Sequence, residues 1–170
     1  MTDFAGLLTA LVSAKVEFIL VGGVAATAHG SPRLTSDLDI VYARTAGNIR
    51  KLVEGLSGLN PYPRGAPPGL PFQWDSETVS RGLNFTLITK LGGIDLLGQI
   101  ASGSPSGGTY LDLLPYTVEL PIFGFPHRCL DLDKLIEVKR AAGRPKDFEA
   151  LAELEAIREE MQFAEDSRIE

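Results

Sequence analysis

The sequence predicts a single α/β (α+β) domain over residues 1–170, in which helices flank a mixed β-sheet and a pair of helices forms the C-terminal part. Two observations support this prediction. Apolar residues switch repeatedly between helical spacing and short β-branched runs, which indicates helices packed on a sheet. After residue 131, two helical patterns follow one another with no strand between them. A chain of 170 residues can enclose one ordinary hydrophobic core.

The first half of the chain is expected to alternate helices with strands. Apolar residues at helical spacing predict helices, and runs rich in β-branched residues predict buried strands. The expected elements are helix 3–14, strand 16–21, helix 24–29, strand 37–42 and helix 47–59. The pair Gly22-Gly23 breaks the first strand, and Gly30 is expected to stop the second helix.

The second half begins with a proline-rich stretch. Five prolines between Asn60 and Phe72 predict that residues 60–82 form a flexible loop, and composition predicts another at about 102–108. The other expected elements are strands 83–89, 94–97, 116–120 and 122–125 and helices 131–140 and 145–162. The pair Gly92-Gly93 is expected to form a hairpin turn, and the tail, about 163–170, is expected to fray.

Composition and charge narrow the functional classes. The net charge of −6 argues against a large basic face for extended nucleic acid. No apolar run is long enough to cross a bilayer and the first residues lack a basic leader, so the sequence predicts a cytoplasmic protein without a membrane partner. Cys129 is the only cysteine, which excludes an internal disulfide, and it is expected to be a small buried apolar residue.

Two aspartates, Asp37 and Asp39, stand at the start of a predicted strand. Because side chains along a strand alternate between faces, both carboxylates point the same way, while Leu38 and Ile40 point into the core. Two like charges on one face are unfavourable unless a cation lies between them, and Mg²⁺ prefers hard oxygen ligands. The pair therefore indicates a site for Mg²⁺ (or Mn²⁺). An exposed aspartate pair at a strand start is the simpler alternative.

The residues before this pair strengthen the metal hypothesis. A buried strand, the turn at Gly22-Gly23 and a helix outline a phosphate cradle, because glycine lets the backbone approach a ligand. A dinucleotide-binding fold has a similar order, but the G-x-G-x-x-G pattern is absent and the aspartates precede the apolar part of their strand. A Walker loop is excluded, because no Gly-Lys-Ser/Thr follows.

The stretch GGVAATAHGSPRLTSDLDIV resembles the nucleotidyltransferase superfamily, whose motif places Gly-Gly or Gly-Ser roughly a dozen residues before D-x-D on a strand. The later stretch LDKLIEVKRAAGRPKDFEAL resembles the C-terminal helices of AbiEii-like and related minimal nucleotidyltransferases. The resemblance covers most of the chain except the proline-rich loop, and it implies a nucleotidyltransferase-like mixed sheet. In one departure, the small hydroxyl residue often found in the cradle is Gly23 here. In another, little chain follows Gln162 to bind an acceptor.

The resemblance also implies a third carboxylate on a later strand, and Asp95 in GGIDLLG is the candidate. An unpaired acid between Ile94 and Leu96 would be unfavourable, and a metal ion or a basic partner would offset that. The alternative is an acid at a strand edge facing water. Weaker substitutes are Asp75, Glu77 and Asp112.

Basic residues for the nucleotide are also implied by the resemblance. Lys139 and Lys146 are similar to the family's basic residues in the C-terminal helices, and Arg144 accompanies them. Lysine is a mobile point charge that suits outer phosphates. Arg33 lies before the acidic strand, where it could reach a phosphate or an acceptor. For Lys146 a solvated surface charge is the alternative.

Together these residues predict a nucleotidyltransferase that binds an NTP and Mg²⁺ and transfers a nucleoside monophosphate to an acceptor. Asp37 and Asp39 are expected to hold both metal ions, and Asp95 to hold the catalytic ion and help activate the acceptor. The expected nucleotide-binding residues are Gly22, Gly23, Arg33, Lys139 and Lys146. The acceptor could be RNA, a protein or a small molecule, and its site could need a protein partner or a homodimer. By resemblance, a toxin–antitoxin or phage-defence role is conceivable.

Two other functional classes remain open at this point. One is a catalytically inactive nucleotide- or partner-binding module that keeps the scaffold. The other is a structural or antitoxin-like partner with no affinity for NTP. Asp95 distinguishes the first of these from the enzyme, because a metal site is incomplete if Asp95 points away from the face that carries Asp37 and Asp39.

Overall fold

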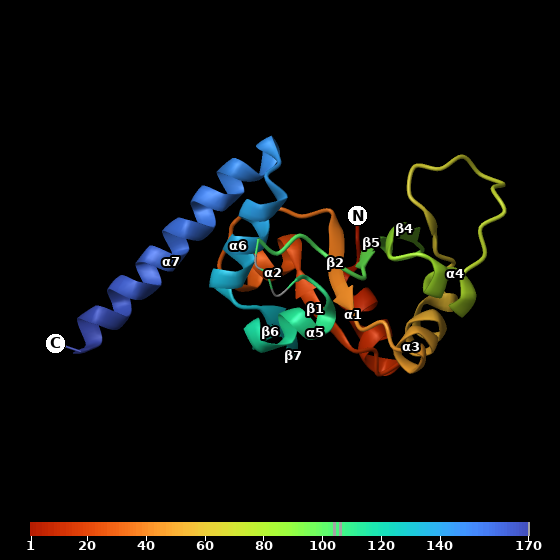
Figure 1. The fold of residues 1–170 in the computed structure, drawn as a ribbon, viewed down its shortest axis with the longest axis horizontal. Coiled ribbons are helices and arrows are strands. Elements are labelled where there is room, and N and C mark those ends of the chain that lie inside the picture. Colours follow the sequence, from red (N-terminus) through yellow and green to blue (C-terminus); the bar gives the residue numbers. More distant parts are fainter. Residues whose placement is uncertain (104, 106, 170) are drawn as a thin grey trace.

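The computed structural model describes residues 1–103, 105 and 107–169. Within these residues, seven strands form one mixed sheet in the order β3-β4-β5-β2-β1-β7-β6, with helices packed on it (Figure 1). The strands are β1 (Phe18–Val21), β2 (Asp37–Tyr42), β3 (Tyr62–Pro63), β4 (Asn84–Thr89), β5 (Gly92–Leu97), β6 (Thr117–Ile122) and β7 (Phe125–Leu130). β1 pairs antiparallel with β2 and parallel with β7, and β2 pairs parallel with β5. The predicted fold class is confirmed.

The helices begin and end largely where caps occur in the sequence. They are α1 (Phe4–Ser13), α2 (Gly22–Ala28), α3 (Ala46–Ser57), α4 (Ser76–Arg81), α5 (Tyr110–Leu113), α6 (Leu132–Ala142) and α7 (Phe148–Ile169), with 3-10 turns at Leu114–Tyr116 and Pro145–Asp147. The side chains of Asp3, Thr45 and Asp131 each accept a hydrogen bond from an N–H of the first turn of their helix. Gly143, with φ of 62°, ends α6 in the left-handed conformation.

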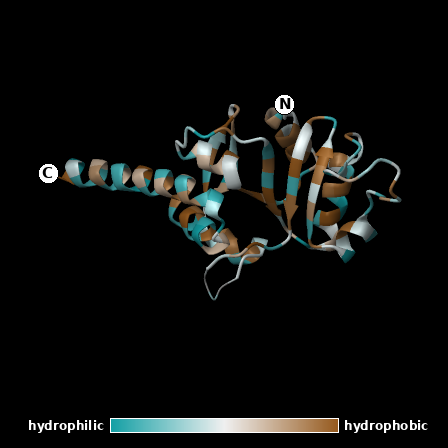
Figure 2. Cartoon of the chain, turned by 90° about the horizontal axis from the view of Figure 1, so that it is seen from above, coloured by the Kyte–Doolittle hydropathy of each residue, from teal (hydrophilic) through white to brown (hydrophobic). Residues whose placement is uncertain are grey.

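The hydrophobic core lies along the central strands. Leu20 of β1, Ile40 of β2 and Leu96 of β5 are fully buried, and Figure 2 shows apolar residues running along these strands. Leu11 of α1 and Leu52 of α3 are fully buried in the same core. The apolar runs seen in the sequence are therefore the buried parts of the sheet. Their burial fixes the strands that carry the acidic residues.

Two turns differ from the sequence prediction. Gly92 and Gly93 begin β5, whereas Lys90 and Leu91 form the hairpin turn. The Thr89 hydroxyl donates to the carbonyl oxygen of Gly92 and accepts from the N–H of Leu91, which closes the turn two residues earlier than predicted. The predicted strand 122–125 is also wrong. It contains the turn between β6 and β7, where Phe123 and Gly124 both have positive φ.

The proline-rich region is more regular than predicted. It contains β3, which pairs with β4, and α4, whose first turn is capped by Asp75. The Trp74 indole N–H donates to the carbonyl oxygen of Val53 and so ties the region to α3. The flexibility expected of residues 60–82 stays a prediction. The same holds for the loop 102–108, of which residues 104 and 106 lie outside the described residues.

The last helix is longer than predicted. α7 continues to Ile169 instead of ending near Gln162, because the residues after 162 include good helix formers. Figure 1 shows its distal half projecting from the body of the molecule. Leu154 is its buried residue, whereas Phe163 and Ile169 are exposed. The expected fraying stays a prediction, and residue 170 lies outside the described part. In that part, no helix is both long enough and apolar enough to span a membrane.

Candidate active site

Three aspartates lie together where β2 and β5 run side by side. The register aligns Asp39 with Asp95 and Asp37 with Gly93. Paired residues of neighbouring strands point to the same face, so the carboxylates of Asp39 and Asp95 are direct neighbours and that of Asp37 lies two residues away on the same face. The intervening Leu38 and Ile94 are fully buried on the opposite face. The weaker substitutes lie elsewhere, because Asp75 and Asp112 cap helices and Glu77 pairs with Arg81.

Two glycines make room for these carboxylates. A Cβ atom on Gly22 would lie 2.0 Å from Oδ2 of Asp39, and one on Gly93 would lie 2.0 Å from Oδ1 of Asp37. Gly22 also has φ of +66°, a conformation that side chains disfavour. Gly23 is packed in the same way against Thr35, because a Cβ atom on Gly23 would lie only 2.5 Å from the Cβ atom of Thr35. Gly22 and Gly23, expected to form a turn, are the first residues of α2, and the start of this helix is shaped by the acid of the neighbouring strand.

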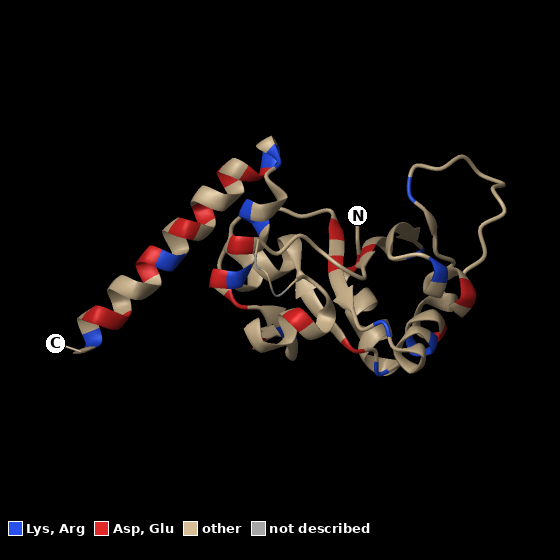
Figure 3. Ribbon diagram, viewed as in Figure 1, with Lys and Arg blue, Asp and Glu red and all other residues tan. Residues whose placement is uncertain are grey.

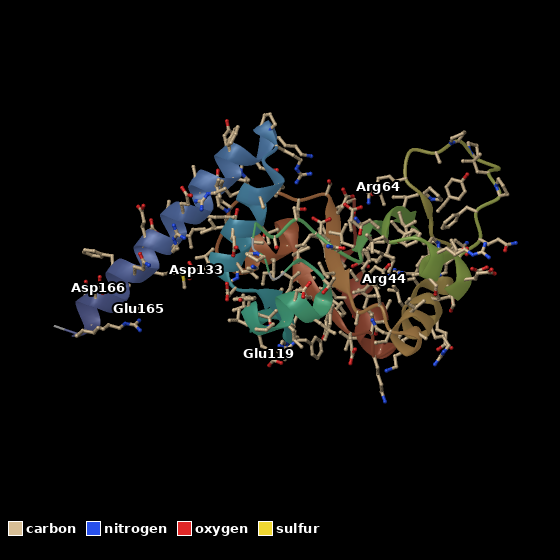
Figure 4. The ribbon with its side chains drawn as sticks, in the orientation of Figure 1. Arg44, Arg64, Glu119, Asp133, Glu165 and Asp166 are labelled. Atoms are coloured by element: carbon tan, nitrogen blue, oxygen red, sulfur yellow. The ribbon has the colours of Figure 1, made fainter. Side chains whose placement is uncertain are left out.

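A residue that sequence reasoning missed, Arg64, joins two of the aspartates. Its Nη1 lies 3.1 Å from Oδ2 of Asp37, and its Nη2 lies 2.7 Å from Oδ1 of Asp95 and 2.9 Å from the carbonyl oxygen of Leu87. Figure 4 shows Arg64 between the proline-rich loop and the strands that carry the aspartates. The sequence offered one signal for this role, because Arg64 is the only charged residue between Asn60 and Phe72.

The acidic cluster changes the proton affinity of Asp39. Burial raises the pKa of its carboxyl to about 7, and a hydrogen bond and the negative charge of Asp95 add to the rise. The charge of Asp37 acts in the same direction, whereas the Arg64 guanidinium opposes it. A cation placed beside Asp39 would therefore favour the ionised form of its carboxyl.

Two cavities open beside these residues. One of about 370 Å³ is lined by Gly22, Asp39 and Asn84 on the sheet side and by Leu135 and Lys139 of α6. A second, of about 280 Å³, is lined by residues that include Gly23, Arg33, Lys139, Arg144 and Lys146. Lys139 and Arg144 line both cavities, so the two adjoin. Figure 3 shows acidic residues at the start of β2 and basic residues near the end of α6 at the same end of the molecule.

The basic side chains are held by acids that the sequence prediction did not assign. Asp147 is buried and lies 3.4 Å from Nζ of Lys139 and 2.7 Å from Nε of Arg144. Burial alone would raise the pKa of Asp147, but these two cations outweigh it and the pKa is lowered. Asp147 therefore stays ionised and fixes both basic groups at the cavity wall.

Arg33 is engaged by the last helix. Its Nη2 lies 3.0 Å from Glu149 and its Nε 2.9 Å from Glu153, which raises its pKa and fastens the loop before β2 to α7. Lys146 is exposed at the rim of the smaller cavity. The structure thus brings Lys139 near the aspartates and leaves Arg33 and Lys146 farther out.

Comparison with known proteins identifies the architecture. No protein-family model matches the sequence, and no curated protein sequence matches it. Among the solved structures that match, two do so over nearly the whole chain. One is a candidate nucleotidyltransferase from Thermotoga maritima, with 16% identity and a TM-score of 0.56 over 89% of this chain and 93% of that one. The other is the lincosamide antibiotic adenylyltransferase LnuA bound to lincomycin, with 17% identity and a TM-score of 0.58 over 92% of this chain and 98% of that one. The chain has the nucleotidyltransferase fold.

On this nucleotidyltransferase fold, the donor chemistry fits a hard divalent cation although the side chains are not arranged as a finished metal site. Among residues 1–103, 105 and 107–169, no group of three or more His, Cys, Asp or Glu side chains is placed to hold a metal ion. Arg64 bonds Asp37 and Asp95, whereas Asp39 lines the open cavity. Carboxylate oxygens are the ligands that Mg²⁺ and Mn²⁺ prefer, and a buried carboxylate with a raised pKa gains from a cation.

Proposed function

We propose that the protein is a metal-dependent nucleotidyltransferase, which takes an NTP with Mg²⁺ or Mn²⁺ and transfers the nucleoside monophosphate to an acceptor. The observation that carries the proposal is the alignment of Asp39 with Asp95 beside the turn at Gly22. In that arrangement two carboxylates meet a backbone that a phosphate can approach closely. The shared fold with LnuA, described as an adenylyltransferase, supports the class of reaction.

In the proposed reaction, the acceptor oxygen forms a bond to the α-phosphorus while the bond from that phosphorus to the pyrophosphate oxygen breaks. Asp95 accepts the proton of the acceptor hydroxyl, and pyrophosphate leaves with the bond's electron pair. Lys139 and Arg144, fixed by Asp147, hold the outer phosphates at the wall shared by the two cavities. A bound divalent cation would screen the phosphate charge and orient the α-phosphate. Catalysis then rests on positioning and charge stabilisation.

The position of Asp95 supports the enzyme over an inactive binding module. Asp95 faces the same side as Asp39 and is linked to Asp37 through Arg64, so the three carboxylates lie together instead of pointing apart. The acceptor is an RNA, a protein or a small molecule, and the likeness to LnuA, bound to lincomycin, favours a small molecule. The resemblance of the C-terminal helices to AbiEii-like proteins supports a cytoplasmic role in a toxin–antitoxin or defence system, with a protein partner or a second copy completing the acceptor site.

The test is a nucleotide-transfer assay with each labelled NTP in Mg²⁺ and in Mn²⁺. The wild type should transfer label, whereas the double variant Asp37→Ala/Asp39→Ala should not. Asp133→Ala is the matched control, because its carboxylate is exposed and lines neither cavity. Calorimetry that detected no metal-dependent NTP binding by the wild type would refute the enzyme. Transfer that persisted in the double variant would refute the site.

A further inference from the structure

Arg64 is a built-in positive charge within the acidic cluster. Its backbone N–H donates to the carbonyl oxygen of Thr86, and the preceding Pro63 pairs with Leu87 on β4, so the start of the side chain is fixed to the sheet. The guanidinium then crosses β4 and β5 to reach Asp37. Its position is therefore set by the strand pairing and not by a free loop.

The guanidinium lies between Asp37 and Asp95, which is where a cation would have to lie to contact both. Arg64 donates to Oδ2 of Asp37 and to Oδ1 of Asp95, and the Ser36 hydroxyl also lies 3.2 Å from Oδ2 of Asp37. The Nε of Arg64 is buried without a hydrogen-bond partner in the described part of the chain. The two ionic contacts therefore hold the side chain in place despite an unsatisfied donor.

The open approach to the cluster lies on the other side. The cavity of about 370 Å³ reaches Asp39 and Gly22, and its lining does not include Asp37 or Asp95. Lys139, across this cavity, is already paired with Asp147. A cation that entered from this cavity would meet Asp39 first, and Asp95, paired with Asp39 across the two strands, would be the next carboxylate within reach, whereas Arg64 covers the other side of the cluster.

We propose that the site binds one divalent cation per chain, beside Asp39 and Asp95, and that Arg64 supplies the positive charge that a second metal ion would otherwise provide. The inference rests on the proposed function and refines its metal requirement. It replaces the sequence-based expectation that Asp37 and Asp39 hold two ions. Arg64 also keeps the Asp37 and Asp95 carboxylates oriented, so it is a positioning residue for the reaction.

The test counts bound Mn²⁺ by electron paramagnetic resonance of the free ion, with one equivalent of α,β-methylene-ATP and a protein-free correction for the analogue. The wild type should bind one Mn²⁺ per chain. Arg64→Gln and Arg64→Met should bind two, because the space and the oxygens between Asp37 and Asp95 become available. Arg64→Lys should stay at one. Arg81→Gln, which removes an exposed arginine paired with Glu77, is the matched control and should also stay at one.

The number of Mn²⁺ ions bound per chain tests the role of Arg64 separately from the proposed function on which the inference rests. Two ions in the wild type, or one in a folded Arg64→Gln or Arg64→Met protein, would overturn the role of Arg64 and leave the enzyme proposal intact. No bound ion in the wild type would overturn both. Arg64→Met retains the aliphatic packing of the side chain, so it serves if Arg64→Gln does not fold, and circular dichroism verifies each variant.

Discussion

Replacing Asp39 by asparagine should remove a pH dependence of stability that arises in the acidic cluster. Burial and the neighbouring Asp95 raise the pKa of the Asp39 carboxyl from 3.8 to about 7. Between these two values the native state binds a proton that the unfolded state has released, so the free energy of unfolding falls as the pH rises. Above a pH of about 7 this decrease in the free energy of unfolding is complete. Asparagine has the shape of the protonated side chain and cannot ionise.

The size of this stability change follows from the width of the pH range over which Asp39 keeps its proton only in the native state. Between pH of about 5.5 and the pKa of about 7 lie roughly 1.5 units, and each unit corresponds to about 1.4 kcal/mol. The wild type should therefore lose up to about 2 kcal/mol between pH of about 5.5 and about 8.5 relative to Asp39→Asn. This is an upper value, because the pKa of Asp39 depends on its close contacts with Asp95 and Arg64.

The assay is urea unfolding of both proteins at the two pH values in the presence of EDTA, which keeps divalent cations away from the carboxylates. All other ionisable side chains are common to both proteins, so their contributions cancel in the difference. Asp133→Asn is the control, because that carboxylate is 81% exposed. If the difference in unfolding free energy between Asp39→Asn and the wild type is the same at both pH values, the reasoning about Asp39 is refuted.

Three further predictions concern other residues. Gly22→Ala should lower the unfolding free energy by about 2 kcal/mol or more, because the new Cβ meets a carboxylate oxygen at 2.0 Å and φ is +66°. Thermal unfolding checks this beside Gly58→Ala, where a Cβ meets nothing within 4 Å, and equal melting temperatures would contradict it. Asn48→Ala should cost about 2–4 kcal/mol in urea unfolding, because the buried amide serves three backbone groups at 2.7–3.0 Å. A loss below about 1 kcal/mol would show that these bonds are replaced. Lys139→Met should weaken NTP binding about tenfold in calorimetry, the equivalent of about 1.4 kcal/mol. Lys90→Met, which changes an exposed lysine, should leave NTP binding unchanged. If Lys139→Met binds NTP as tightly as the wild type, Lys139 does not belong to the site.

The sequence predicted the parts of the fold whose signals are local. The first two strands were expected over 16–21 and 37–42, and the structure has them at Phe18–Val21 and Asp37–Tyr42, because both are buried in the sheet. The helix expected over 131–140 is α6 at Leu132–Ala142, which begins after the cap at Asp131 and ends before the left-handed Gly143. Short-range chemistry decides these features, so a sequence pattern can reveal them.

Features set by distant neighbours were not predictable in this way. The pair Gly92-Gly93 has the composition of a hairpin turn, but Gly93 is small because the carboxylate of Asp37 occupies the space next to it. Apolar runs indicate that strands are buried without identifying their partners, so the order of the seven strands in the described sheet could not be derived.

The same division applies to the candidate site. That Asp37 and Asp39 share a face follows from strand geometry, whereas Asp95 was selected by resemblance to a family. Arg64 and Asp147 were missed as site residues, because each acquires its role from partners on other elements. A charged residue alone among prolines has no periodic signal, and only the pairing of β3 with β4 directs Arg64 to the cluster.

The parallel pairing of β1 with β7 has a consequence for the order in which the molecule is made. Leu20 lies opposite Cys129, and both are fully buried. During synthesis on the ribosome, the apolar strand β1 therefore lacks its second neighbour until the residues of β7, Phe125–Leu130, have been made. The edge that will be sealed by β7 is during this time an open template for pairing with other strands. We expect synthesis, and not the finished fold, to be the stage at which this protein most needs a chaperone.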